Sequence, residues 1–176
     1  MLNPTPPTPR EDTVVLGLDP GLARLGFGAV ASNPHGELRA LRYGVISTPA
    51  SQPTPQRLRT LANAVTQLLD ELHPAAVAVE RLYFSTNVKT AMAVGEARGV
   101  ILLALQHGAA PVYEFTPQQV KQTVANSGRA DKRQIQTMVK LLLRLPKLPQ
   151  PDDAADALAL AICGHRAHAS PVERKA

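Results

Sequence analysis

A short apolar run that stops at an acid and a Pro-Gly pair constrains this chain more than any other feature. Residues 14–18 read Val-Val-Leu-Gly-Leu, and Asp19, Pro20 and Gly21 follow at once. The run predicts a buried strand, and Pro-Gly predicts a tight turn directly after it. A carboxylate at this place is costly to desolvate unless it is hydrogen-bonded, paired or bound to a cation. Asp19 therefore either accepts backbone N–H groups in the turn or belongs to a functional site.

Two further strands are expected to follow the turn. Residues 25–32 and 38–46 read as strands, and the sequence Asn-Pro-His-Gly at 33–36 between them is a strong turn signal. Residues 47–55 are rich in Pro, Ser and Thr and are expected to form a loop. The chain is thus predicted to begin with three antiparallel strands.

A second strand that ends in an acid comes after a helix. Residues 57–72 carry apolar side chains at helical spacing, which predicts an amphipathic helix packed on the sheet. Residues 75–80, Ala-Ala-Val-Ala-Val-Glu, predict a short buried strand that ends at Glu80. A strand, a crossover helix and a strand pair in parallel, with their carboxyl ends at one edge of the sheet. We therefore expect Glu80 to lie close to Asp19, at the edge where open α/β sheets bind ligands.

The rest of the chain is predicted to form helices and one more strand. The expected elements are helices at 91–106, after Thr116-Pro117, from a cap at Asp131 to about Arg144, and from 152 to 163, with a strand at 111–115. Gly95 and Gly99 lie about one turn apart in the first of these helices. Small residues at this spacing let a neighbouring helix approach closely, so this helix is a candidate for tight packing within the domain or between subunits.

The last predicted helix opens with three acids. Asp152 and Asp153 fall in its first turn, where the helix dipole favours acids, so a structural role also explains them. Asp156 shares a face with Asp153 and is harder to explain by the dipole. If this pair meets the two strand-end acids, neighbouring charges about 4 Å apart repel by roughly 4 kcal/mol at an effective dielectric near 20. Such a cluster needs cations.

The donor atoms of this cluster select the kind of cation. The stretches that carry the acids hold no paired His or Cys ligands, so oxygen donors favour Mg²⁺ or Mn²⁺ over zinc. Two such ions about 3.5 to 4 Å apart activate water and stabilise the leaving oxygen when a phosphodiester is cleaved. The acids therefore predict a metal-dependent nuclease.

Basic and aromatic residues indicate a nucleic-acid partner. Residues 81–89, Arg-Leu-Tyr-Phe-Ser-Thr-Asn-Val-Lys, suit stacking on bases and contact with phosphates, although one ring could instead belong to the core. Lys132 and Arg133 stand in the first turn of a predicted helix, where the dipole disfavours cations. An external anion or a solvated charge pair would explain them. The candidate DNA-binding residues are Arg81, Tyr83, Phe84, Lys89, Lys121, Arg129, Lys132 and Arg133.

Composition adds limits on organisation and location. The 176 residues predict one domain at 13–165, between a flexible Pro-rich tail at 1–12 and a flexible basic tail at 166–176. A net charge of +5 suits a polyanionic partner, and no apolar run approaches the length of a membrane span. The single cysteine, Cys163, excludes an intrachain disulfide and fits a cytoplasmic location, and its apolar neighbours predict that it is buried.

Five segments, in their order and spacing, resemble the RuvC family of Holliday-junction resolvases: LGLDPGLARLGFGAV, VAVERLYF, VGEARGV, FTPQQVKQTV and DDAADALALA. The resemblance runs from about Thr13 to His165. It implies a single α/β domain of the ribonuclease H-like fold, with a mixed five-stranded sheet flanked by helices. It also implies a homodimer that uses two Mg²⁺ ions per active site, with Mn²⁺ as a substitute. The implied reaction is a pair of symmetric nicks in four-way junction DNA that leaves ligatable 5′-phosphate ends, in cooperation with the RuvA and RuvB branch-migration proteins.

The resemblance also assigns residues by position. It makes four acids the catalytic residues and metal ligands: Asp19, Glu80, Asp153 and Asp156. The family has one acid directly before Ala-Ala-Asp, which selects Asp153 over the neighbouring Asp152. Tyr83, beside Phe84, matches an aromatic that stacks at the junction centre. Lys121 and Lys132 match basic residues near DNA.

Three other classes of protein share parts of this pattern. Actin-like ATPases and sugar kinases also begin with an acid-ended strand and Pro-Gly, but they need two such domains. A YqgF-like RNA-processing nuclease shares the first acid motif, whereas the aromatic loop and the Asp-Ala-Ala-Asp helix favour a resolvase. A non-catalytic architectural DNA-binding protein would explain the basicity and leave the acids unexplained.

Overall fold

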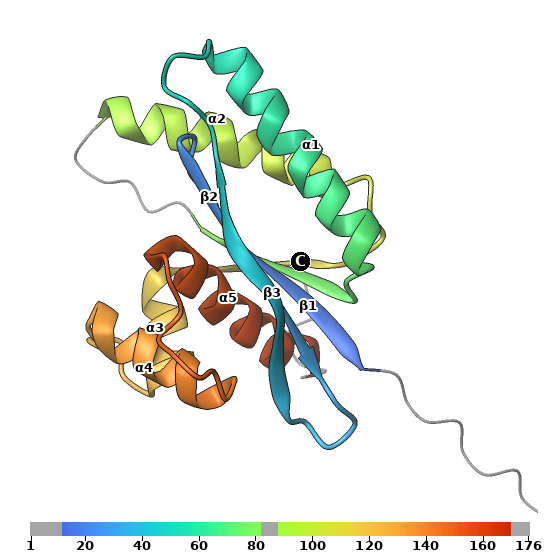
Figure 1. The fold of residues 1–176 in the computed structure, drawn as a ribbon, viewed down its shortest axis with the longest axis vertical. Helices are drawn as coiled ribbons and strands as arrows, with labels where there is room; N and C mark the ends of the chain where they lie inside the picture. The colour runs from blue at the N-terminus through green and yellow to red at the C-terminus, as the bar shows by residue number, and fades with distance from the viewer. Residues whose placement is uncertain (1–11, 82–87, 170–176) are drawn as a thin grey trace, which may run out of the picture.

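The computed structural model of this protein describes residues 12–81 and 88–169, which form a five-stranded sheet with helices on both faces (Figure 1). In chain order the elements are β1 (Thr13–Asp19), β2 (Arg24–Ser32), β3 (Leu38–Ser47), α1 (Thr54–Leu72), β4 (Ala76–Glu80), α2 (Val88–Leu105), β5 (Val112–Phe115), α3 (Pro117–Ala125), α4 (Lys132–Leu142) and α5 (Asp152–Ala169). The sheet order is β3-β2-β1-β4-β5. The β1, β2 and β3 strands pair antiparallel, whereas β4 pairs in parallel with both β1 and β5. This is the mixed sheet that the sequence predicts.

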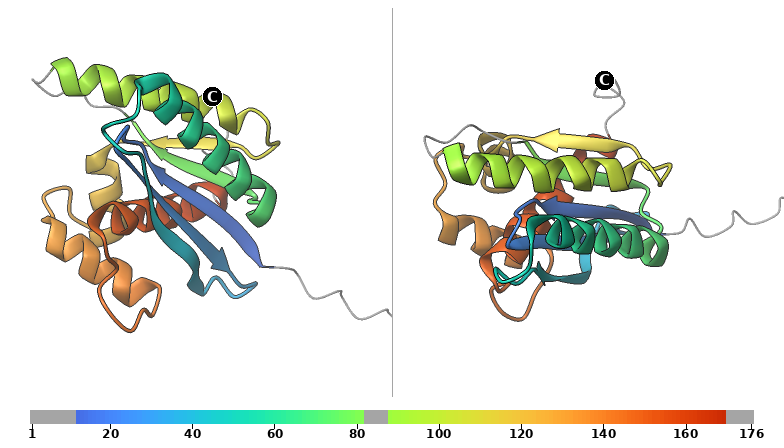
Figure 2. Two further views of the ribbon diagram at one scale, coloured as in Figure 1. Left: turned by 45° about the horizontal axis from the view of Figure 1, so that its top comes forward. Right: turned by 90° about the horizontal axis from the view of Figure 1, so that it is seen from above.

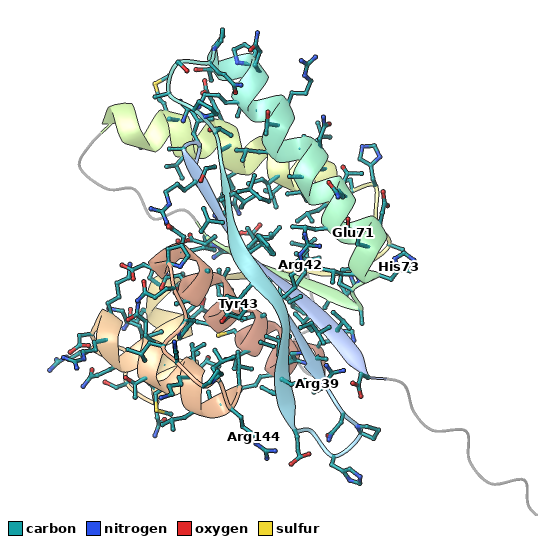
Figure 3. The ribbon with its side chains drawn as sticks, viewed as in Figure 1. Arg39, Arg42, Tyr43, Glu71, His73 and Arg144 are labelled. Atoms are coloured by element: carbon teal, nitrogen blue, oxygen red, sulfur yellow. The ribbon has the colours of Figure 1, made fainter. Side chains whose placement is uncertain are left out.

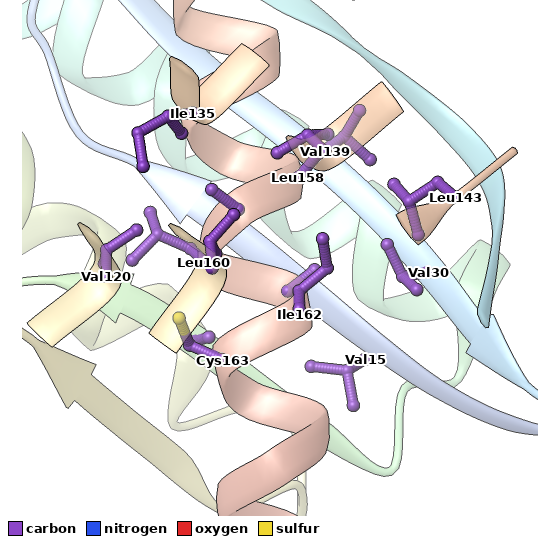
Figure 4. Packing of buried hydrophobic residues seen from close by; sticks show 14 of the residues in the cluster. Val15, Val30, Val120, Ile135, Val139, Leu143, Leu158, Leu160, Ile162 and Cys163 are labelled. Atoms are coloured by element: carbon purple, nitrogen blue, oxygen red, sulfur yellow. The ribbon is translucent and has the colours of Figure 1, made fainter. Parts of the chain in front are cut away.

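Each face of the sheet has its own apolar core. The α1 and α2 helices lie side by side on one face, where Leu16, Leu18 and Phe27 pack against them (Figure 2). The α5 helix crosses the other face, and α3 and α4 pack against it (Figures 1 and 4). The predicted buried thiol, Cys163, lies in this second core. On the exposed edge of the sheet, Arg42 of β3 pairs with Glu71 of α1 (Figure 3).

The α5 helix touches the sheet through backbone atoms. A Cβ atom at Gly17 of β1 would overlap the carbonyl oxygen of Ala157, and one at Gly28 of β2 would stand 2.8 Å from the backbone nitrogen of Leu158. These glycines let the alanine-rich helix approach more closely than side chains would allow. The close approach determines where the acids at the start of α5 lie.

Three helices extend beyond their predicted limits. The first predicted helix begins at Thr54, inside the predicted loop, because Pro55 stands in its first turn, where a missing N–H breaks no helical bond. The second begins at Val88, three residues earlier than predicted. The last continues to Ala169 with Ala167 buried, so residues 166–169 are helix and not the predicted tail. The other parts of the two predicted tails, 1–11 and 170–176, lie outside the described residues.

None of the helices in the described ranges combines the length and the apolar character that a bilayer span requires.

Candidate active site

Two strands bring Asp19 and Glu80 to the same edge of the sheet. Parallel pairing sets Leu18 beside Val79, so the next residues on the two strands are the two acids. The two carboxyl groups are close enough for Glu80 to act on the pKa of Asp19. Burial, followed by the negative charge of Glu80 and of the acids on α5, raises the pKa of Asp19 to about 8. Burial also raises the pKa of Glu80. Burial thus disfavours the charged form of both carboxyl groups at this edge of the sheet.

Two acids of α5 complete the cluster. The charges of Asp153 and Asp156 both act on Asp19, and burial is the largest cause of the raised pKa of Asp156. The backbone of Asp153 packs directly on Gly26 of β2, which pairs with Asp19 in the β1–β2 ladder. Four carboxylates from β1, β4 and α5 thus meet at one end of the sheet, as the sequence predicts.

Two cations of the chain itself pair with the helix acids. Arg24 Nη2 lies 2.8 Å from Asp153 Oδ2, and Lys132 Nζ lies 3.5 Å from Asp156 Oδ2. Lys132 also reaches Asp152 Oδ2 at 3.2 Å. An external anion is therefore not required to explain Lys132 in the free protein, because Asp152 and Asp156 balance the charge of Lys132. Sequence reasoning missed Arg24 entirely.

The two adjacent acids of α5 have different partners. Asp152 pairs with Lys132 and accepts a hydrogen bond from Gln136 Nε2 at 2.8 Å, and these two contacts, Lys132 first, lower its pKa. Asp153 pairs instead with Arg24 and acts on Asp19. This difference supports the selection of Asp153 as the member of the acid cluster.

The donor set fits a divalent cation. Its carboxylate oxygens suit Mg²⁺ or Mn²⁺, and the pKa of Asp19 is raised first by burial and then by the negative charges of the neighbouring acids. Within residues 12–81 and 88–169, no three His, Cys, Asp or Glu side chains are arranged so that they could bind one metal ion together. In this arrangement Arg24 and Lys132 pair with the carboxylates of Asp153 and Asp156.

Neighbouring residues fix the backbone on both sides of the cluster. Arg98 of α2 donates from Nε to the carbonyl oxygen of Glu80 at 3.3 Å, and its Nη2 lies 2.7 Å from Glu114 Oε2. The turn after Asp19 is held by Thr48, which donates its hydroxyl to the carbonyl oxygen of Leu22. No sequence pattern predicts these contacts, because they join segments that are distant along the chain.

The predicted DNA-binding residues fall into different places. Lys121 and Lys132 line a pocket of about 270 Å³ whose wall also includes Glu80 and Asp156. Arg129 is exposed, and Arg133 lines a separate pocket of about 460 Å³. Arg81 pairs with Glu114 at 3.4 Å. Tyr83, Phe84 and the side chain of Lys89 lie outside the described residues, so their roles stay predictions.

Comparison with known proteins points to one family. A sequence model of the family described as crossover junction endodeoxyribonuclease RuvC matches residues 15–165. A protein of that name from Thermomicrobium roseum is 57% identical over 149 residues, which are 85% of this chain and 90% of that protein. A protein of the same name from Roseiflexus sp. is 50% identical over 163 residues, which are 93% and 95% of the two chains.

Solved structures agree with the sequence relatives. The structure described as T. thermophilus RuvC in complex with Holliday junction substrate superimposes with a TM-score of 0.81 and 38% identity, over 85% of this chain and 91% of that chain. The yeast mitochondrial Holliday junction resolvase Ydc2 has a TM-score of 0.62 and 13% identity, over 84% and 77% of the two chains, so it shares the fold.

Proposed function

Because this chain belongs to the RuvC family of crossover junction endodeoxyribonucleases, it is a Holliday-junction resolvase, and we propose that four acids carry out its reaction: Asp19, Glu80, Asp153 and Asp156. Its mixed sheet with flanking helices is the ribonuclease H-like fold of the family, and its activity belongs to DNA recombination and repair. The observation that carries the assignment is the meeting of acids from β1, β4 and α5, whose charges add to the effect of burial and raise the pKa of Asp19 to about 8.

The four acids would hold the divalent metal that the family implies, with two Mg²⁺ ions per site expected and Mn²⁺ as a substitute. When bound, these ions activate water for attack on the phosphodiester and stabilise the leaving oxygen. The chain's own part is to hold the carboxylates together against their repulsion. Gly17 and Gly26 allow the backbone of α5 to lie close against the sheet, which places the helix acids. Arg98 donates a hydrogen bond to the carbonyl oxygen of Glu80, which positions the end of β4.

The junction DNA would enter over the pocket that Lys121 and Lys132 share with the acids. Ammonium groups beside a nuclease site bind backbone phosphates and set the register of the strand. We extend the DNA contact to the other predicted residues: Arg81, Tyr83, Phe84, Lys89, Arg129 and Arg133. A chromosomal DNA substrate also supports the expected cytoplasmic location.

A homodimer would supply the two equivalent sites that a two-fold junction requires. The α2 helix supports this proposal, because Met92 and Leu103 are 66% and 68% exposed and Gly99 has open space beside it. These residues lie on one face of the helix, while Ala97 and Ile101 are buried in the core. Cooperation with RuvA and RuvB is an expectation from the family, and co-purification of the three proteins on junction DNA would test it.

Asp19→Asn tests the assignment of the acids. The variant should lose paired cleavage of a synthetic four-way junction in Mg²⁺ and in Mn²⁺, while it binds the junction as tightly as the wild type. Linear duplex DNA and EDTA are the substrate and metal controls. Asp12→Asn is the matched protein control, because Asp12 pairs with Arg39 away from the cluster. Loss of junction binding would make Asp19 a structural residue, and retained cleavage would remove it from the catalytic group.

A further inference from the structure

Arg24 occupies a specific place beside the acid cluster. It begins β2, two residues before Gly26, and residues two apart on a strand face the same side. Gly26 and Gly28 on that side lie against the backbone of α5, so Arg24 is the first position of this row with a side chain. Its guanidinium reaches Asp153 Oδ2 at 2.8 Å.

We propose that Arg24 is the resident counter-cation of Asp153, that a divalent metal ion displaces it, and that Arg24 thereby lowers the metal affinity of the site. The inference rests on the proposed metal site and assigns control of its metal affinity to a residue outside the four acids. A metal ion that uses the Asp153 carboxylate must replace the guanidinium that now holds the Oδ2 atom.

The exposure of the pair makes this exchange feasible. The side chain of Arg24 is 50% exposed and that of Asp153 is 32% exposed. An ion pair in contact with water is weak and reversible, so the guanidinium can leave without a large penalty. Among the described residues Asp153 is the only ion-pair partner of Arg24, whereas Lys132 also pairs with Asp152 and keeps a partner if it leaves Asp156.

Arg24 is not needed to hold Asp153 in place. The start of α5 is seated by backbone contact at Gly26 and, one turn further on, at Gly17. Removal of the guanidinium therefore leaves the Asp153 carboxylate in place and takes away only the group that competes with the metal ion for it. This separates the role proposed here from a general stabilising role.

Metal affinity measures the competition directly. Binding of Mn²⁺ to the full chain, without DNA, is followed by the electron paramagnetic resonance signal of the free ion and by calorimetry. Arg24→Gln should bind Mn²⁺ about 3- to 10-fold more tightly than the wild type, since a weak pair and a nearby positive charge are both removed. Arg24→Lys keeps the charge and should stay within about twofold of the wild type.

Arg39→Gln is the matched control. Arg39 has an exposed ion pair of the same length, 2.8 Å to Asp12, and lies at the other end of the β2–β3 ladder (Figure 3). Its loss should leave the Mn²⁺ affinity unchanged. An unchanged or weaker affinity in Arg24→Gln would overturn the inference and leave the metal site intact. Absence of Mn²⁺ binding in the wild type, with Asp153→Asn indistinguishable from it, would overturn the metal site as well.

Discussion

A Cβ atom at Gly26 of β2 would overlap the backbone carbonyl oxygen of Asp153 of α5. This contact joins the strand that pairs with Asp19 to the helix that carries two more of the acids. The geometry of the cluster therefore depends on a position that has no side chain and no chemistry of its own.

Gly26→Ala should displace the start of α5 from the sheet. The added methyl group would overlap the backbone of Asp153, so the helix must move to remove the clash. We expect the free energy of unfolding to fall by about 1 to 3 kcal/mol. Junction cleavage should fall by roughly a hundredfold, because catalytic groups tolerate little displacement. Urea unfolding and single-turnover cleavage measure the two effects.

Gly108→Ala is the control for that experiment. The methyl group added there would meet its nearest neighbour, Leu69 Cδ1, at an ordinary 3.6 Å. This variant should keep both the stability and the cleavage rate of the wild type. If Gly26→Ala cleaved junctions at the wild-type rate, the close contact between α5 and the sheet would not determine the positions of the acids.

Metal binding should raise the stability of the wild type and not that of Asp19→Asn. A ligand that binds only the folded state at 100 times its dissociation constant adds about 2.7 kcal/mol. Without metal, Asp19→Asn should melt at a higher temperature than the wild type, because the substitution removes a buried acid from a group of like charges. Melting temperatures with Mg²⁺ and with EDTA give the comparison. An equal gain from Mg²⁺ in both proteins would contradict a metal site at Asp19.

The sequence was sufficient to predict the acidic edge of the sheet, because each step depends on a local pattern. The runs before Asp19 and Glu80 read as strands, and the helix between them requires a parallel pair. The structure brings the two side chains together on β1 and β4, and Asp153 and Asp156 join them from α5.

The partner of Asp153 could not be predicted, because it depends on a long-range approach. Arg24 follows a half-buried turn and carries no motif, and its contact exists only because α5 lies so close to β2. A signal was present in the glycines at 17, 26 and 28, which face a helix rich in alanine. The end of α5 was missed for a similar reason, since a buried bond to β2 holds His165 in the helix.

His165 should make the protein less stable in mild acid. Its Nε2 donates to the carbonyl oxygen of Val30 at 2.8 Å, next to the irregularity in the β2–β3 ladder. Burial, and to a smaller extent the charge of His168, lowers its pKa below the usual 6.5. The unfolded chain therefore takes up a proton at a higher pH than the folded protein does. Stability from this group is complete above about pH 6.5 and is lost as the pH falls below it.

His165→Gln isolates this effect, since an amide can donate to Val30 but does not titrate. Between pH 7.5 and 5.5 the wild type should lose on the order of 1 kcal/mol more than the variant. Urea unfolding at the two pH values measures the difference. Equal losses in the two proteins would mean that His165 is protonated as readily in the fold as in the unfolded chain.

The exposed apolar face of α2 should determine the oligomeric state. Leu103 and Met92 stand in solvent on a helix whose opposite side is fully packed, and a charged side chain at this face would be costly to bury in a dimer. Leu103→Lys should therefore sediment as a monomer at micromolar concentration, where we expect the wild type to sediment as a dimer. Leu141→Lys on α4 is the matched control, because that leucine is 62% exposed on the other face of the sheet and should not affect association.

The cleavage pattern provides a second measurement, since a monomer that still binds a junction would make single nicks where a dimer makes symmetric pairs. A dimer of Leu103→Lys as stable as that of the wild type would show that the two subunits meet on another surface.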